Sequence, residues 1–234
     1  MVTEQDIKDY YNSHHREKGT GAWRPPAAFP YFLDLAGVSG GQRVLDIGCG
    51  TGFLLQAADA RGAETHGLDI SEEALKLAAE ATPNSELKIG KAEALPYGDA
   101  HFHRVFCLGA MEHFLDMDKG LDEMIRVTAP GGKLCVVVPN DNYWWWLFHR
   151  QKGTHQQAIN ERMMSLQAWQ DFFRKHGLAI ETVCQDRHWF LHGTPVFSSK
   201  NPLVWLRILS RKLRWAILPL RHTYQFIFLL QKPE

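Results

Sequence analysis

The feature that most constrains the fold is a glycine turn between a strand-like run and a helix-like run. The sequence VLDIGCGTGFLL starts as a short apolar run, passes through Gly48, Gly50 and Gly52, and continues with a helical pattern from about Phe53. Glycine is needed where backbone turns tightly and approaches a ligand closely, because a Cβ atom would clash or forbid the dihedral angles. A strand, a glycine turn and a helix N-terminus predict a nucleotide-binding crevice at the carboxyl edge of a parallel sheet.

Strand-like and helix-like segments alternate around this turn. Ser71, which is followed by two glutamates, is expected to cap one of the helices, and Ser165 is expected to cap another. Strict alternation is typical of a parallel sheet covered by helices on both faces. The short apolar runs predict strands at 43–47, 64–70, 86–90, 102–110, 132–139, 178–185 and 223–233.

The chain is long enough, at 234 residues, for one large domain with a buried core. Two connections after Pro139 are longer than a crossover needs, and loops of that length often form lids or binding elements. We expect a single domain over 1–234, made of a helical cap at 1–39, a ligand-binding core at 40–140, and lid segments at 140–164 and 187–221.

The composition argues for a cytoplasmic protein without a bound metal. The N-terminus is polar, and no run approaches the roughly 18 apolar residues of a membrane span. The four cysteines are scattered without CxxC spacing, which suits a reducing compartment. His188 and His192 are four residues apart, as in some metal sites, but no third ligand is evident, so we predict no metal.

The charges divide unevenly along the chain although the formal net charge is zero. Residues 187–234 hold eight Lys and Arg against one acidic residue, and residues 1–186 hold 18 against 25. Two interpretations stay open: the basic segment docks on the acidic body, or it faces an anionic partner such as a phospholipid surface. A helix predicted at 201–215, with its arginines on one side, fits either a lid or peripheral membrane contact.

The glycine pattern itself favours one ligand over another. Dinucleotide sites prefer GxGxxG, with a pyrophosphate at the helix N-terminus, whereas the spacing here is GxGxG. Asp46 lies two residues before Gly48 and would repel a pyrophosphate, but it suits a ligand that carries an amino group and a sulfonium. Asp69, 21 residues beyond Gly48, is placed to accept hydrogen bonds from ribose hydroxyls. These features favour S-adenosylmethionine over NAD.

The successive motifs VLDIGCGTG, GLDIS, KAEALPYGDAHF, LGAMEHF and RVTAPGGKLCVVVPN resemble those of class I S-adenosylmethionine-dependent methyltransferases. The resemblance covers about residues 40–140 and is greatest to the subgroup that includes the ubiquinone and menaquinone biosynthesis enzymes. It implies an α/β Rossmann-like sandwich with a seven-stranded, mostly parallel sheet whose last strand is antiparallel. It also implies S-adenosyl-L-methionine as methyl donor, with S-adenosyl-L-homocysteine as product.

The same resemblance assigns binding positions, which fall into four groups along the cofactor. They are Asp46, Gly48, Gly50 and Gly52 around the methionine part, Asp69 and Ile70 at the ribose and adenine, Ala92 and Glu93 along the adenine edge, and Leu108, Gly109 and His113 beneath the methyl donor. Tyr10 or Tyr11 matches the position that often closes over the cofactor's carboxylate, although simple helix packing would also explain the pair. Lys91 departs from the family, which usually has Asp or Asn at this position to accept a hydrogen bond from the adenine amino group. Lysine cannot accept a hydrogen bond.

Histidine is the natural candidate for a general base, because its unperturbed pKa is about 6.5. His113 follows Glu112 directly beyond the fourth strand, and a structural role for it is the alternative. His155 is a second candidate. The Asn/Asp-Pro-Pro-aromatic motif of amino-methylating nucleic-acid enzymes is missing after this strand, so no nucleic-acid substrate is expected.

The acceptor side is predicted from the consecutive residues Trp144, Trp145 and Trp146. Neighbours on a helix point about 100° apart, so the three cannot all face one core. We expect a short helix here, capped by Asn140 or Asp141, that packs partly on the sheet and partly roofs an acceptor pocket. The predicted acceptor is an apolar or aromatic small molecule such as a quinone, isoprenoid, lipid or secondary metabolite. The alternative is a cofactor-binding module that engages a protein or membrane partner without catalysis of its own.

Overall fold

The computed structural model describes residues 2–20, 24–144, 146, 159–186 and 218–234. Their centre is one seven-stranded sheet with the order β3-β2-β1-β4-β5-β7-β6. Neighbouring strands are parallel from β3 to β5, and β7 runs antiparallel to both β5 and β6. The Rossmann-like fold expected from the sequence is therefore confirmed. The strands are β1 (Arg43–Ile47), β2 (Glu64–Asp69), β3 (Glu86–Ile89), β4 (Phe102–Leu108), β5 (Thr128–Pro139), β6 (Ala179–Gln185) and β7 (Gln225–Gln231).

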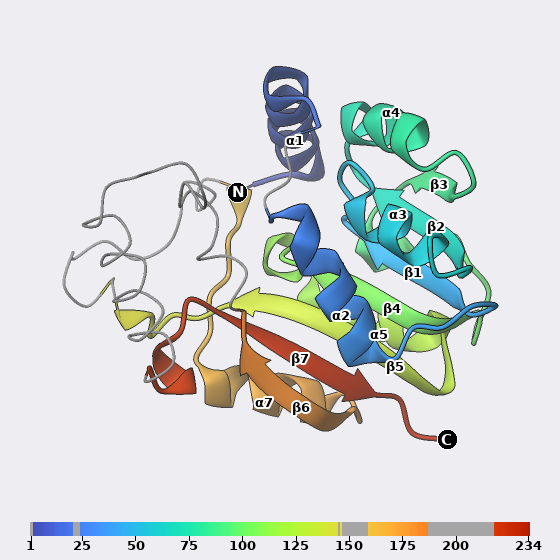
Figure 1. Ribbon diagram of the computed structural model, residues 1–234. Coiled ribbons are helices and arrows are strands. Elements are labelled where there is room, and N and C mark those ends of the chain that lie inside the picture. Colours follow the sequence, from blue (N-terminus) through green and yellow to red (C-terminus); the bar gives the residue numbers. More distant parts are fainter. Residues whose placement is uncertain (1, 21–23, 145, 147–158, 187–217) are drawn as a thin grey trace, which may run out of the picture.

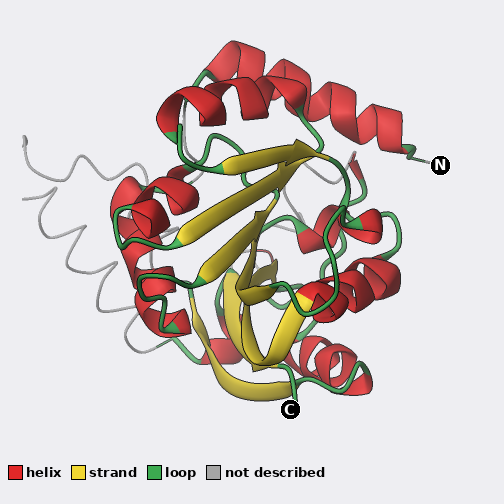
Figure 2. Cartoon of the chain, turned by 90° about the vertical axis from the view of Figure 1, so that its right-hand side faces the viewer, coloured by secondary structure: helices red, strands yellow, loops and turns green. Residues whose placement is uncertain are grey.

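Helices cover both faces of the sheet (Figures 1 and 2). One face packs against α5 and α7, and the other packs against α2 and α3. Within β5, Leu134, Val136 and Val138 belong to the first core and Cys135 and Val137 to the second, as the alternation of side chains along a strand requires. The helices are α1 (Glu4–Lys18), α2 (Phe29–Ala36), α3 (Phe53–Asp59), α4 (Glu72–Ala81), α5 (Met117–Val127) and α7 (Leu166–Lys175).

The helix starts follow the local signals in the sequence. Ser71 and Ser165 are the N-caps of α4 and α7, and their hydroxyls accept hydrogen bonds from the N–H groups of Ala74 and Ala168. Each cap satisfies a donor that the first turn of the helix leaves without a partner. Both predicted caps are confirmed.

Strand β5 begins four residues earlier than the prediction of 132. Thr128 pairs with Phe102, and the register then shifts before Arg104 pairs with Lys133. The sequence between, Ala-Pro-Gly-Gly, carries turn signals that hide the pairing from a local pattern. The prediction was too short because pairing with β4 overrides this local preference.

Several predictions fall outside the described residues. These are the basic helix at 201–215, His155, His188, His192, Trp145, residues 147–158 of the first proposed lid segment and residues 187–217 of the second. They stay predictions. Among the helices that the structure describes, none combines the length and apolarity needed to cross a membrane.

Candidate functional site

A pocket of about 190 Å³ opens at the carboxyl edge of the sheet. Strands β1, β2 and β4 end there, and β7, which runs the other way, begins there. Helix α1 contributes Ile7, Tyr11 and His15 to the wall. All the predicted cofactor positions except Gly52 line this one pocket: Tyr11, Asp46, Gly48, Gly50, Asp69, Ile70, Ala92, Glu93, Leu108, Gly109 and His113.

The glycine loop after β1 is fixed by backbone hydrogen bonds to the end of β2. The N–H groups of Gly48 and Cys49 donate to the carbonyl of Leu68 at 2.8 and 3.1 Å. Gly48 has φ +71°, and a Cβ atom there would lie 2.7 Å from the Cβ of Ala110. The loop thus presents bare backbone to the pocket at a position where no side chain fits.

Replacing Gly48 with Ala should destabilise the protein and weaken ligand binding. The left-handed conformation costs an L-residue about 1–2 kcal/mol, and the overlap with Ala110 adds to that cost. Thermal unfolding measures the effect, with Gly98→Ala as the matched control, because a Cβ atom at Gly98 meets nothing within 4 Å. Equal melting temperatures for the two variants would contradict the steric argument.

Two buried carboxylates lie beside the glycine loop. Asp69 accepts hydrogen bonds from the N–H groups of Gly50 and Ser71, both at 2.8 Å. Burial raises the pKa of Asp69, and burial together with the charge of Asp69 raises the pKa of Asp46 well above its usual value. A cationic ligand that also donates hydrogen bonds would stabilise the ionised form of both groups. The ammonium, sulfonium and ribose hydroxyls of S-adenosylmethionine fit this set of acceptors.

Gly52 does not line the pocket. It is the N-cap of α3, with φ +84°, and it lies against α4. A Cβ atom at Gly52 would be 3.1 Å from Thr82 and 3.3 Å from Ala78. The glycine here permits close packing of two helices. The structure does not bring Gly52 to the pocket wall, where a ligand contact was predicted.

Two charged residues at the predicted adenine edge interact with other parts of the chain. Glu93 is buried, and its Oε1 accepts hydrogen bonds from the N–H groups of Leu115 and Asp116 at 2.8 and 3.2 Å. Lys91 lines the pocket and forms an ion pair with Glu4 of α1. The lysine that departs from the family pattern therefore pairs with a residue of α1.

The end of β4 places Leu108, Gly109 and His113 on the pocket wall. The rings of Tyr11 and His113 pack edge to face with their centroids 6.1 Å apart. Of the two tyrosines left open by the sequence, Tyr11 lines the pocket and Tyr10 does not. Burial and the nearby charge of Glu112 raise the pKa of the Tyr11 hydroxyl well above its usual value, which keeps it protonated as a hydrogen-bond donor.

Glu112 is a pocket residue that the sequence predictions left out. It is 3% exposed, and among the described residues its Oε2 has no hydrogen-bond partner. Burial raises its pKa from 4.5 to about 8. The signal was available, because Glu112 precedes His113 in the same motif, but only the histidine was assigned a role.

The pH dependence of stability should change in a Glu112→Gln variant. The folded protein holds the Glu112 proton up to about pH 8, whereas the unfolded chain releases it near 4.5. Folding stability from this group is therefore present at low pH and lost as pH rises through that window, by up to about 1.4 kcal/mol per unit. In urea unfolding, the free energy of unfolding of Glu112→Gln should rise relative to that of the wild type as the pH is raised from 5 to 8. Glu80→Gln, which changes an exposed residue, is the control, and its stability should depend on pH as that of the wild type does. A stability curve of Glu112→Gln that runs parallel to the wild-type curve would contradict the burial argument.

Arg24 connects the pocket to the antiparallel part of the sheet. Its guanidinium pairs with Asp186 at 3.1 Å and donates to the carbonyl of Leu108 at 3.1 Å and to Gln225 Oε1 at 2.9 Å. Arg24 is 5% exposed and Asp186 1% exposed. Sequence reasoning missed Arg24 because its partners lie 84 to 201 residues away.

Part of the tryptophan stretch reaches this region. Asn140 accepts a hydrogen bond from the N–H of Asn142 at 2.9 Å, so it orders the turn that follows β5. Trp146 is 8% exposed and packs with Tyr143 and Tyr224. Tyr224 also lines the pocket. The stretch therefore contacts the pocket wall through Tyr224.

Comparisons with known proteins agree with this geometry. Residues 45–136 match the family described as "Methyltransferase domain". The demethylmenaquinone methyltransferase of Renibacterium salmoninarum is 38% identical over 44% of each chain, and the ubiquinone biosynthesis O-methyltransferase of Alkalilimnicola ehrlichii is 30% identical over 62% of this chain and 64% of that protein. The chain thus matches less than two thirds of the length of either relative.

The fold also agrees with a solved structure that holds a cofactor product. Phosphoethanolamine N-methyltransferase 2 of Haemonchus contortus, in complex with phosphomonomethylethanolamine and S-adenosylhomocysteine, superposes with a TM-score of 0.69. The superposition covers 100% of this chain and 61% of that one, at 20% identity, and so bears on the fold alone. With the motifs, the strand order and the pocket, these matches show that residues 45–136 are similar to the methyltransferase domain family and that they lie in a Rossmann-like fold.

Proposed function

We propose that this protein transfers a methyl group from S-adenosylmethionine to a small-molecule acceptor. The observation that carries the proposal is the convergence of the glycine loop, Asp46 and Asp69 at one pocket that also holds His113 and Glu112. A cofactor-binding module without catalysis would need the first three, but it has no evident use for His113 and Glu112 in the same pocket.

We infer the cofactor's place in the pocket from the chemistry of the walls. Asp46 and the bare backbone of Gly48 and Gly50 would hold the methionine part, and Asp69 would accept the ribose hydroxyls. Ile70 and Ala92 would flank the adenine. The cofactor supplies an already activated methyl group, so the main task of the protein is to align the acceptor and exclude water. Such alignment supplies about 7–11 kcal/mol of barrier reduction in well-oriented reactions.

Two side chains are proposed to interact with the reacting group of the acceptor. His113 lies on the pocket wall against Tyr11, and a neutral imidazole accepts a proton from a hydroxyl or an acidic carbon. Glu112, with a pKa of about 8, is largely protonated at neutral pH and can donate a hydrogen bond to the acceptor. A general base of this kind contributes roughly 10²–10⁴-fold to a rate. His155, the second candidate base, lies outside the described residues.

The apolar part of the pocket wall supports an apolar or aromatic acceptor. Phe29, Phe53 and Tyr224 line the pocket together with Phe114. The rings of Phe29 and Phe53 are stacked with centroids 5.7 Å apart. Relatives named for menaquinone and ubiquinone biosynthesis are consistent with a quinone-like acceptor for this chain too.

A transfer experiment tests the proposal directly. S-adenosylmethionine labelled on its methyl group is incubated with the protein and with lipid, quinone, sugar and amine extracts. We expect label in an apolar or aromatic product, and loss of transfer of about 100-fold or more in His113→Ala if it is the base. Calorimetry provides the cofactor control: binding of NAD but not of S-adenosylmethionine would overturn the proposal.

A further inference from the structure

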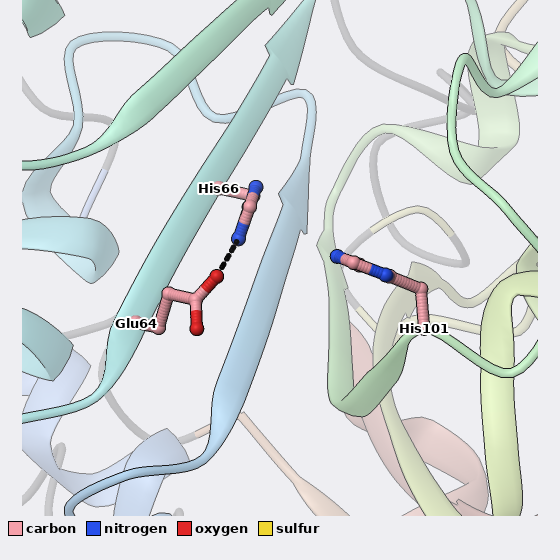
Figure 3. Close-up of side chains that lie close together, drawn as sticks. All are labelled: Glu64, His66 and His101. Atoms are coloured by element: carbon pink, nitrogen blue, oxygen red, sulfur yellow. Dashed lines mark hydrogen bonds and ion pairs between the residues drawn. The ribbon is translucent and has the colours of Figure 1, made fainter.

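Glu64, His66 and His101, which are residue types that can bind metal ions, lie close together (Figure 3). Glu64 and His66 are the first and third residues of β2, and His101 directly precedes β4. The other ends of these strands, at Asp69 and Leu108, line the pocket. The cluster is therefore separated from the pocket by the length of the strands.

The three side chains converge closely enough to share an ion. One nitrogen of each histidine and one carboxylate oxygen of Glu64 lie within 4.8 Å of one another. Two ligands on a tetrahedral zinc lie roughly 3.4 Å apart, given bonds of about 2.0–2.2 Å. The Glu64 side chain is 59% exposed, so it has room to adjust its position around an ion. The fourth position would be left to water.

His66 has the surroundings of a metal-binding histidine. Its Nε2 faces Glu64 Oε1 at 3.1 Å, and its Nδ1 faces Glu86 Oε2 at 3.4 Å. If Nε2 binds a metal, the ring proton is on Nδ1, which lies near the second carboxylate and has no hydrogen-bond partner among the described residues. Metal-binding histidines commonly donate their other N–H to a carboxylate, which fixes the ring and raises its basicity.

His101 is also held in position before any ion binds. Its ring stacks on Tyr97 with an interplanar angle of 16° and meets the His66 ring at 88°. The Arg43 guanidinium donates to the His101 carbonyl, which fixes the backbone at this point. Preorganised ligands reduce the ordering cost of binding.

An ordinary ion-pair cluster is the alternative, and the chain contains one for comparison. His176 lies between Asp118 and Asp122, at 3.0 and 2.7 Å, with each carboxylate on a different ring nitrogen. Among the described residues, only the cluster at Glu64 brings three ligand atoms from two histidines and a carboxylate together.

We propose that Glu64, His66 and His101 bind a divalent first-row transition metal, with zinc as the favoured ion. Imidazole nitrogen with carboxylate oxygen is a donor set that suits zinc. The ion would join the start of β2 to the segment before β4, across β1. This assignment differs from the absence of metal expected from the sequence, which weighed only His188 and His192. The ion would brace the fold and take no part in methyl transfer.

Zinc titration by calorimetry on protein without a histidine tag tests the proposal. Wild type should bind one zinc at this site, and His101→Ala and Glu64→Gln should each weaken that binding about tenfold or more, since even an outer partner is typically worth 10–100-fold. His176→Ala is the matched control and should bind like the wild type. Because His66 is buried and its loss risks misfolding, the test does not depend on it.

Two further measurements separate this site from other histidines and from the pocket. Cobalt(II) should give the visible absorption of four-coordinate metal in the wild type but not in His101→Ala. Zinc should raise the melting temperature of the wild type and not of His101→Ala, while S-adenosylmethionine affinity is the same in both. Zinc affinity and cobalt spectra unchanged in His101→Ala and Glu64→Gln would overturn the proposal.

Discussion

Replacing Asp69 with Ala is expected to weaken S-adenosylmethionine binding by about 100-fold or more. Each hydrogen bond to a charged group contributes about 1.5–3 kcal/mol, and Asp69 is proposed to accept both ribose hydroxyls. The variant also removes the acceptor that holds the N–H of Gly50 at 2.8 Å, so the glycine loop loses an anchor. Isothermal calorimetry measures the change in Kd directly.

The control for this variant is Asp171→Ala, which removes an exposed carboxylate on α7. That carboxylate accepts a hydrogen bond from the side-chain amide of Gln167. It should bind the cofactor like the wild type. Circular dichroism at the assay temperature must show both variants folded. If Asp69→Ala binds within about threefold of the wild type while folded, the ribose contact, and with it the cofactor placement, is wrong.

Replacing Arg24 with Met should cost about 3–5 kcal/mol of folding stability, because it removes the guanidinium from a pair whose other member stays buried. Asp186 is 1% exposed. For a chain of this size the loss corresponds to a fall in melting temperature of about 10 °C. The double variant Arg24→Met/Asp186→Leu should recover much of it, since an apolar pair of similar volume avoids the buried charge.

An exposed pair serves as the comparison. Arg174 and Asp171 are 3.7 Å apart with side chains 56% and 62% exposed, and exposed pairs contribute about 0–1 kcal/mol. Arg174→Met should therefore change the melting temperature by no more than a few degrees. A similar small effect for Arg24→Met, or no recovery in the double variant, would show that Arg24 does not act through this buried pair.

The parts of the site that the sequence predicted are those carried by short motifs. Asp46 lies near the end of one strand, Gly48 and Gly50 follow that strand, and Asp69 ends the next. Each lies within a few residues of the pattern that reveals it. Parallel strands bring all their carboxyl ends to one edge, so correct strands were enough to place these residues together. The same logic does not distinguish Gly52, which is absent from the pocket wall, because a glycine that permits helix packing gives the same local pattern as one that contacts a ligand.

The parts that the sequence missed depend on contacts between distant segments. Arg24 and Gln225 are 201 residues apart in the sequence and meet in the folded protein. Tyr224 reaches the pocket because β7 begins at the edge where the parallel strands end. Glu112 differs, since its position was visible and only its burial was not. Its raised pKa results from packing that no local pattern encodes.

The placement of β7 has a consequence for how the protein forms. Residues 225–231 enter the interior of the sheet, between β5 and β6, rather than adding to its border. A nascent chain therefore presents β5 with an open hydrogen-bonding edge until this segment has been synthesised, and such edges are the usual route to intermolecular strand pairing. The contact between Arg24 and Gln225 forms at the same step. The ligand pocket would therefore be completed only after residue 225 has been translated. A chain shortened before residue 225 should aggregate rather than fold into a smaller domain.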